Sequence, residues 1–85
     1  MKTIWKYFFE FPQSTIAMPK GAKIVHVDVQ RGEPQMWVLV ESTAEKELRT
    51  FVVHGTGHPI PEYHKYVGTY QEAPFVWHIF EEVRE

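Results

Sequence analysis

The residues best suited to hold a ligand lie in one short segment, Gly55-Thr56-Gly57-His58-Pro59-Ile60-Pro61, directly after His54. Glycine allows backbone conformations that other residues avoid, and proline fixes its own φ, so this composition predicts a constrained loop. Successive N–H groups in such a turn can hold an anion. We therefore predict a ligand site formed by Gly55, Thr56, Gly57, His58 and His54. The alternative is a tight loop that needs glycine only for steric reasons.

Two basic residues flank this loop and could add charge to the site. Arg49 lies within a strand-like run beside Phe51 and Val53. A guanidinium among apolar neighbours must pair, reach solvent or bind something. A carboxylate or a phosphate would suit its bidentate geometry, and an exposed strand position is the alternative. Together with Lys65, which follows the loop, Arg49 predicts a small anionic ligand, with a nucleotide as the candidate.

Aromatic residues near the N-terminus could contribute a stacking surface. Trp5 and Tyr7 alternate with polar or smaller residues, and Phe9 and Phe11 continue the same parity. Such a period of two is typical of a strand with one aromatic face. Trp5 and Tyr7 are the members that we predict to stack on a flat ligand. Simple core packing of this face is the alternative.

The histidines leave a metal site open without requiring one. His54 and His58 are four residues apart, but the glycines between them exclude the helical spacing of zinc proteases. Together with Asp28 or His26 they could bind zinc if the strands align them. No serine has the context of a nucleophile, and the chain has no cysteine. We therefore predict no catalytic residue, no metal ligand and no cofactor, with a small metal-dependent hydrolase as an alternative.

Alternating apolar residues separated by turn residues indicate the fold. No segment has a convincing helical period. The predicted strands are Thr3–Phe11, Thr15–Met18, Lys23–Gln30, Gln35–Glu41, Leu48–His54, Tyr66–Gln71 and Phe75–Glu81. This pattern predicts an all-β fold, a small antiparallel sandwich or barrel of about six to seven short strands. Residues 1–85 should form a single domain.

The pattern also predicts how some strands pair and which faces they bury. Gln35–Glu41 is apolar on both faces, which is typical of a central strand. It should form one hairpin with Lys23–Gln30 and a second with Leu48–His54. In Lys23–Gln30 the expected core face is Val25, Val27 and Val29. Gly68, inside a predicted strand, indicates a bulge or a close approach by another part of the chain.

Composition excludes several classes of function. The chain has 85 residues, a formal net charge of −2 and nine basic against eleven acidic residues. This balance disfavours general nucleic-acid binding, which needs a basic face. No apolar run is long enough for a signal peptide or a membrane span, so we expect a soluble intracellular protein. A domain this small and without disulfides is expected to form a homo-oligomer.

Four segments, in the same order, carry a resemblance to a known family: Ile4-Trp5-Lys6-Tyr7, Met18-Pro19-Lys20-Gly21-Ala22, the Gly55–Pro61 loop and Phe75-Val76-Trp77-His78. The chain resembles a family of small uncharacterised proteins found mostly in bacteriophage and prophage genomes. The resemblance implies a viral accessory protein in the cytoplasm of a host bacterium. By analogy with other such proteins, the expected function is binding, here sequestration of a nucleotide-derived host defence signal. The alternatives are a protein-interaction module, which inhibits a host protein or assembles with its own copies, and the hydrolase named above.

Overall fold

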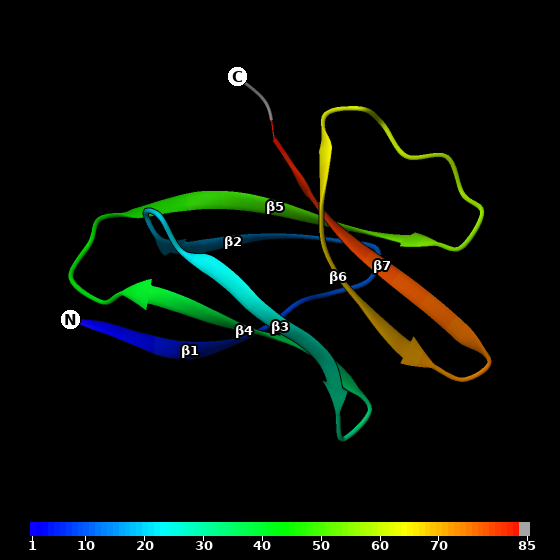
Figure 1. Ribbon diagram of the computed structural model, residues 1–85, viewed down its shortest axis with the longest axis horizontal. Helices are drawn as coiled ribbons and strands as arrows, with labels where there is room; N and C mark the ends of the chain where they lie inside the picture. Colours follow the sequence, from blue (N-terminus) through cyan, green and yellow to red (C-terminus); the bar gives the residue numbers. More distant parts are fainter. Residues whose placement is uncertain (84–85) are drawn as a thin grey trace.

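A computed structural model describes residues 1–83, and this part of the chain contains seven strands and no helix (Figure 1). The strands are β1 (Lys2–Phe8), β2 (Gln13–Pro19), β3 (Lys23–Gln30), β4 (Glu33–Glu41), β5 (Lys46–Gly55), β6 (His64–Glu72) and β7 (Phe75–Glu82). They form two antiparallel sheets, with strand orders β1-β4-β3 and β2-β5-β7-β6. The predicted all-β fold is therefore confirmed, and of the two architectures the sandwich is the one observed.

The core lies between the two sheets and is built by the alternation of the strands. Met36, Val38 and Val40 of β4 point inward and are almost completely buried. From the opposite sheet, Phe51 and Val53 of β5 meet them, together with Ile79 of β7. The period of two thus places every second side chain in the core and leaves the other half on an outer face.

The predicted hairpin of β3 and β4 is confirmed, and Arg31 and Gly32 form its turn. Their φ values are 55° and 77°, and positive φ at both central residues is the signature of the tight turn that matches strand twist. The second predicted hairpin, between β4 and β5, is wrong. Both edges of β4 are already paired, with β1 and with β3, so the chain after Glu41 crosses to the other sheet.

The predicted valine face of β3 is interrupted by a bulge between Ile24 and His26. The bulge reverses the alternation, so Val25 is 49 % exposed, whereas Ile24 packs against the core with Val27 and Val29. A second bulge lies in β6, between Tyr66 and Gly68.

Gly68 marks a close approach between the two sheets, at β3 and β6. A Cβ atom at this position would lie 2.7 Å from Cγ2 of Val27, so β3 approaches the backbone of β6 more closely than any side chain permits. The sequence-based prediction for Gly68 is confirmed in both of its forms, the bulge and the close approach.

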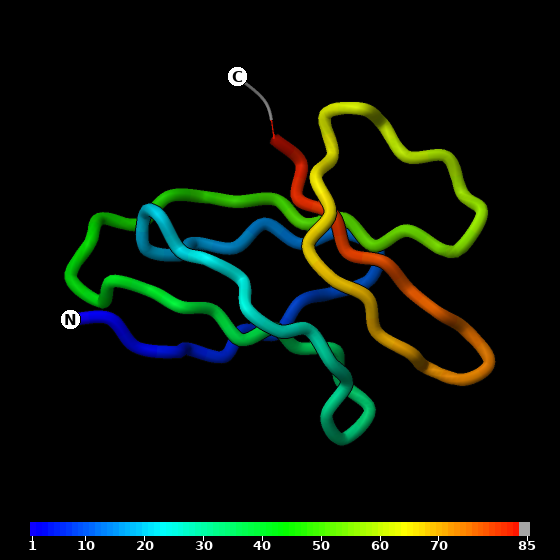
Figure 2. The backbone as a smooth tube through the Cα atoms, in the orientation of Figure 1, coloured from blue at the N-terminus to red at the C-terminus, as the bar shows by residue number. Residues whose placement is uncertain are grey.

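The first strand is shorter than predicted, because β1 ends at Phe8 and the chain then crosses to the other sheet. The N–H of Val53 in β5 donates to the carbonyl of Pro12, which ties this crossing segment to the second sheet. The single aromatic face expected along Thr3–Phe11 is therefore divided. Phe9 is 4 % exposed and part of the core, whereas Phe11 is 58 % exposed. Figure 2 follows this crossing and the long loop between β5 and β6.

Candidate functional site

The glycine-proline loop begins with a tight turn at the end of β5. The N–H of His58 donates to the carbonyl of Gly55 at 3.2 Å, which closes a turn of four residues. Gly57 has φ +88°, a conformation that a residue with a side chain adopts only with strain. The constrained loop is thus present as the sequence predicts. The N–H of His58 is already occupied by this turn, so it is not directed toward a ligand.

The polar side chains next to the turn form a chain of contacts across the outer face of the four-stranded sheet. The Thr56 hydroxyl lies 2.9 Å from Nε2 of His78. Nδ1 of the same histidine lies 3.1 Å from the hydroxyl of Thr69, which is 2.6 Å from the hydroxyl of Tyr66. These contacts follow from the strand register, because Thr69 and His78 are direct partners. They fasten the loop to β6 and β7 through atoms that a ligand would otherwise use.

His54 lies on the same outer face and pairs with His64, their Nε2 and Nδ1 atoms being 3.0 Å apart. Burial is the main cause that lowers the pKa of His54, and the neighbouring His64, His58 and His78 lower it further. Its surroundings therefore favour the neutral imidazole over the charged one, so His54 is a poor source of positive charge for the loop.

A cavity of about 450 Å³ opens beside the loop. The His58 ring covers Gly55, since Cε1 would lie 3.0 Å from a Cβ atom there, and Cζ3 of Trp77 lies 3.3 Å from the same point. The cavity is lined by Gly55, Thr56, His58, Pro74, Phe75, Val76 and Trp77. No Lys or Arg of the described residues contributes to this lining, so an anion would find no permanent positive charge there.

The two basic residues predicted for the site lie elsewhere. Arg49 makes a bidentate contact with Glu81, with both nitrogen–oxygen distances at 2.7 Å, and its third nitrogen donates to the carbonyl of Ala22 at 2.6 Å. The hydrogen bond to Glu81 is the main cause that raises the pKa of Arg49. Lys65 is exposed on β6, an edge strand, and does not line the loop cavity.

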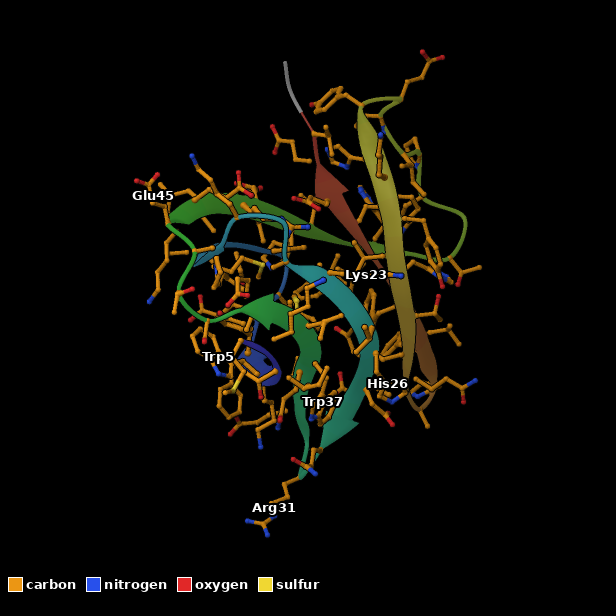
Figure 3. The ribbon with its side chains drawn as sticks, turned by 60° about the vertical axis from the view of Figure 1, so that its left-hand side comes forward. Trp5, Lys23, His26, Arg31, Trp37 and Glu45 are labelled. Atoms are coloured by element: carbon orange, nitrogen blue, oxygen red, sulfur yellow. The ribbon has the colours of Figure 1, made fainter. Side chains whose placement is uncertain are left out.

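Trp5 and Tyr7 belong to the other sheet and do not meet the loop. Both are half-buried in β1 and pack against the core, and burial raises the pKa of Tyr7. In Figure 3, Trp5 lies beside β1, and His26 lies next to Trp37, their ring centroids 5.5 Å apart. Of the predicted site residues, Gly55, Thr56 and His58 line the loop cavity, and Gly57 lies in the same turn. His54 pairs with His64 instead, and Arg49, Lys65, Trp5 and Tyr7 lie outside the cavity.

The metal alternative has no cluster of ligands within residues 1–83. No three His, Asp or Glu side chains of this part of the chain converge as a metal site would require. His26 and Asp28 pair with each other at 3.6 Å in β3, which is in the sheet opposite His54.

A larger cleft, which the sequence patterns did not indicate, adjoins the loop cavity. Its volume is about 710 Å³, and it shares Phe75 and Trp77 with that cavity. Trp77 contacts two other rings, with centroids 4.9 Å from Phe11 and 5.3 Å from Phe75. The cleft is lined by Phe8, Phe9, Glu10, Phe11, Glu33, Pro34, Tyr70, Glu72, Phe75 and Trp77. We call it the aromatic cleft.

The aromatic cleft is assembled from three parts of the chain that lie far apart in sequence. They are the segment Phe8–Phe11, which begins at the last residue of β1, then the start of β4, and the hairpin of β6 and β7. Tyr70 forms part of the inner wall, where its ring meets Phe9 at 5.7 Å, and burial raises the pKa of Tyr70 to about 12. The one signal in the sequence was the recurrence of phenylalanine beside glutamate in Phe8-Phe9-Glu10-Phe11.

Comparison with protein families gives one match, which covers residues 1–85 and is described as Domain of unknown function (DUF7352). The chain belongs to this family. No curated protein and no solved structure matches the chain. The family description assigns no activity.

The described residues include no helix long and apolar enough to cross a membrane.

Proposed function

We propose that the protein is a binding module that captures a small molecule in the aromatic cleft and the adjoining loop cavity. One observation carries the proposal: a hollow of about 710 Å³, with six aromatic side chains in its lining, lies at the surface of a domain of only 85 residues. Small-molecule sites are typically concave and mostly apolar, with volumes of about 300–1,000 Å³ and a few polar groups that orient the ligand.

The exposure of the lining residues supports a ligand over simple core packing. Phe8, Phe11 and Phe75 are each more than half exposed, although their rings converge on one hollow. Large apolar side chains gathered at an exposed, concave place usually mark a binding surface. Burying these three rings against a ligand would remove apolar area from water at about 25 cal/mol per Å².

The nucleotide-derived defence signal, expected by analogy from the family resemblance, is a narrower form of this proposal. It would use the loop cavity, where the base could stack on Trp77 and the His58 side chain could meet polar atoms. The described lining offers no Lys or Arg for the phosphates. The broader proposal of a small-molecule site does not depend on this charge.

The test is native mass spectrometry of the untagged protein as purified from cells, together with thermal shift against neutral, cationic and nucleotide compounds. We expect a bound small molecule or a saturable rise in melting temperature, since a ligand that binds only the native state stabilises it. Phe75→Ala should abolish both the bound small molecule and the ligand-dependent rise in melting temperature. Ile4→Ala is the control, because Ile4 is also an exposed apolar residue but lies on β1, outside the aromatic cleft and the loop cavity. Equal behaviour of the two variants, or no ligand in either assay, would contradict the proposal.

A second candidate, assembly with a second copy of the chain, is favoured by the outer face of the four-stranded sheet. Leu48 is 74 % exposed there and Tyr66 61 %, whereas Val52 and Phe80 between them are half-buried. Exposed apolar patches of this kind mark protein interfaces. Light scattering should show a dimer that Tyr66→Glu converts to a monomer, and a monomeric native protein would remove this candidate.

A further inference from the structure

The charge of the aromatic cleft has one sign. Its lining includes three exposed carboxylates, Glu10, Glu33 and Glu72. No Lys, Arg or His of the described residues belongs to the lining. The cleft therefore has a negative potential, which attracts cations and repels phosphates and carboxylates.

The aromatic rings of the cleft add a second attraction for positive charge. The face of an aromatic ring is electron-rich, and a cation within about 6 Å of the ring centroid is attracted to it, most strongly by Trp. The ring of Trp77 is inclined by 61° to Phe11 and by 31° to Phe75. Trp77 touches both other rings, with centroids 4.9 Å from Phe11 and 5.3 Å from Phe75, so the three form one continuous aromatic wall of the cleft on which an alkylated ammonium group can rest.

An inorganic cation does not fit this lining. Calcium and magnesium need several converging oxygen atoms, and the described residues contain no such cluster. An alkylated ammonium spreads its charge over apolar methyl groups, so it can lose water against rings while the carboxylates balance its charge from the rim.

The protein itself shows a weak form of the same contact next to the cleft. The ammonium of Lys6 lies 5.9 Å from the ring centroid of Phe8, and it donates to Oε1 of Gln30 at 3.3 Å. Lys6 lines the neighbouring cavity rather than the aromatic cleft. Because Lys6 contacts Phe8, which lines the aromatic cleft, its charge would oppose a bound cation.

We infer that the ligand of the aromatic cleft is a small organic cation with an alkylated ammonium group, held by Trp77, Phe11 and Phe75 and balanced by Glu10, Glu33 and Glu72. This inference rests on the proposed function and names the chemical class of its ligand.

The experiment compares two soluble probes of nearly the same shape, choline and 3,3-dimethylbutan-1-ol, which differ in the charge of the quaternary centre. Binding is followed in NMR spectra of the three indole N–H signals of Trp5, Trp37 and Trp77, assigned with Trp77→Phe. We expect choline to shift the Trp77 signal saturably, with an affinity about tenfold above that of the alcohol. The Trp5 and Trp37 signals should stay in place.

Two sets of variants test where the charge acts. Replacing Glu10, Glu33 and Glu72 together by Gln should lower the choline affinity by roughly tenfold and leave the affinity for the alcohol unchanged. Since these side chains are exposed, the melting temperature should not change, which shows that the variant is folded. Lys6→Met should raise the affinity for choline.

The outcomes separate this inference from the proposed function. If the alcohol shifts the Trp77 signal as strongly as choline, or the Gln variant keeps its affinity for choline, the cation class is wrong and the small-molecule site stands. If adenosine monophosphate shifts Trp77 and choline does not, the cation class is again wrong and the nucleotide form is favoured. If no probe of the three shifts Trp77, the cation class is overturned and the aromatic cleft loses its support as a ligand site.

Discussion

The contact between Arg49 and Glu81 allows a direct test of whether Arg49 stabilises the fold or binds a ligand. Its side chain is 15 % exposed and that of Glu81 is 18 % exposed, and the guanidinium makes three hydrogen bonds within the chain. This geometry assigns Arg49 to the sandwich, where it joins β5 to β7 and to the turn after β2. We therefore predict that replacing Arg49 lowers stability and leaves ligand binding unchanged.

The magnitude follows from the burial and the number of contacts. Removing one partner of a fully buried ion pair costs about 3–5 kcal/mol, because the other charge is left without compensation. Both side chains keep some exposure, so Arg49→Met should cost about 2–3 kcal/mol. In a domain of this size that corresponds to a fall in melting temperature of roughly 10–20 °C. Glu81→Gln keeps the shape and part of the hydrogen bonding, and should cost about 1–2 kcal/mol.

The assay is urea unfolding of the two single variants and of Arg49→Met combined with Glu81→Gln. The double variant removes both charges, so it should lose less stability than the sum of the single losses, by about 1–3 kcal/mol. Binding at the aromatic cleft, measured in parallel, should be retained in all folded variants. An Arg49→Met protein with unchanged stability but without ligand binding would refute the structural assignment of Arg49.

Three further predictions concern the loop, the contact between the sheets and pH. Gly68→Ala should lower stability by about 1–3 kcal/mol through its clash with Val27, and the combination with Val27→Ala should cost less than the sum, as denaturant midpoints will show. Gly57→Val should cost about 1–3 kcal/mol from backbone strain at φ +88°, since nothing lies within 4 Å of its Cβ position; a loss below about 0.5 kcal/mol would argue against strain. The pKa of His54 is lower in the folded than in the unfolded chain, so the unfolded state binds the proton more readily. The free energy of unfolding should therefore decrease as the pH is lowered from about 6.5. Urea midpoints at about pH 7.5 and pH 5 should show this loss in the native protein and a smaller one in His54→Gln.

The strands could be predicted because a period of two reports directly which side chains share a face. The bounds of Lys23–Gln30 agree with β3, and the face of Met36, Val38 and Val40 is the buried face of β4. Trp77 and Ile79, which are two residues apart in the predicted strand Phe75–Glu81, lie together on the inner side of β7. These inferences need only the geometry of one strand, which the local sequence contains.

The partners of the strands could not be predicted from the same pattern. The segment that follows β4 looks like the return of a hairpin, yet β5 pairs with β2 and β7. Alternation gives the face that a strand buries but not the neighbour at its edge, and a polar turn such as Ser42–Glu45 can close a hairpin or lead to another sheet. The bulge at Val25 was equally hidden, because one extra residue changes the face without changing the composition.

In the candidate site, too, the features set by neighbouring residues could be predicted, and those set by distant residues could not. The turn at Gly57 was predictable, since a loop of glycine and proline constrains its own backbone. The ion pair of Arg49 with Glu81 could not be predicted, because the two residues are 32 positions apart in the sequence. Only the pairing of β5 with β7 brings their side chains together. The sequence therefore predicted that Arg49 would give positive charge to an anion site at the loop. In the folded chain this charge is paired with Glu81 and does not reach the loop cavity.

The aromatic cleft follows from the point at which β1 ends. Had the strand continued to Phe11, its alternation would have turned Phe9 and Phe11 to one side, and the residues would have shared a single surface of the sheet. The chain instead leaves the sheet after Phe8, so Phe9 enters the core, and Phe11 reaches across to Trp77 on the opposite sheet. The same crossing carries Glu10 to the rim. The end of β1 at Phe8 thus creates both the aromatic cleft and part of its negative charge. For this reason Phe9 and Phe11, which were expected to share one strand face with Trp5 and Tyr7, line a site between the two sheets instead.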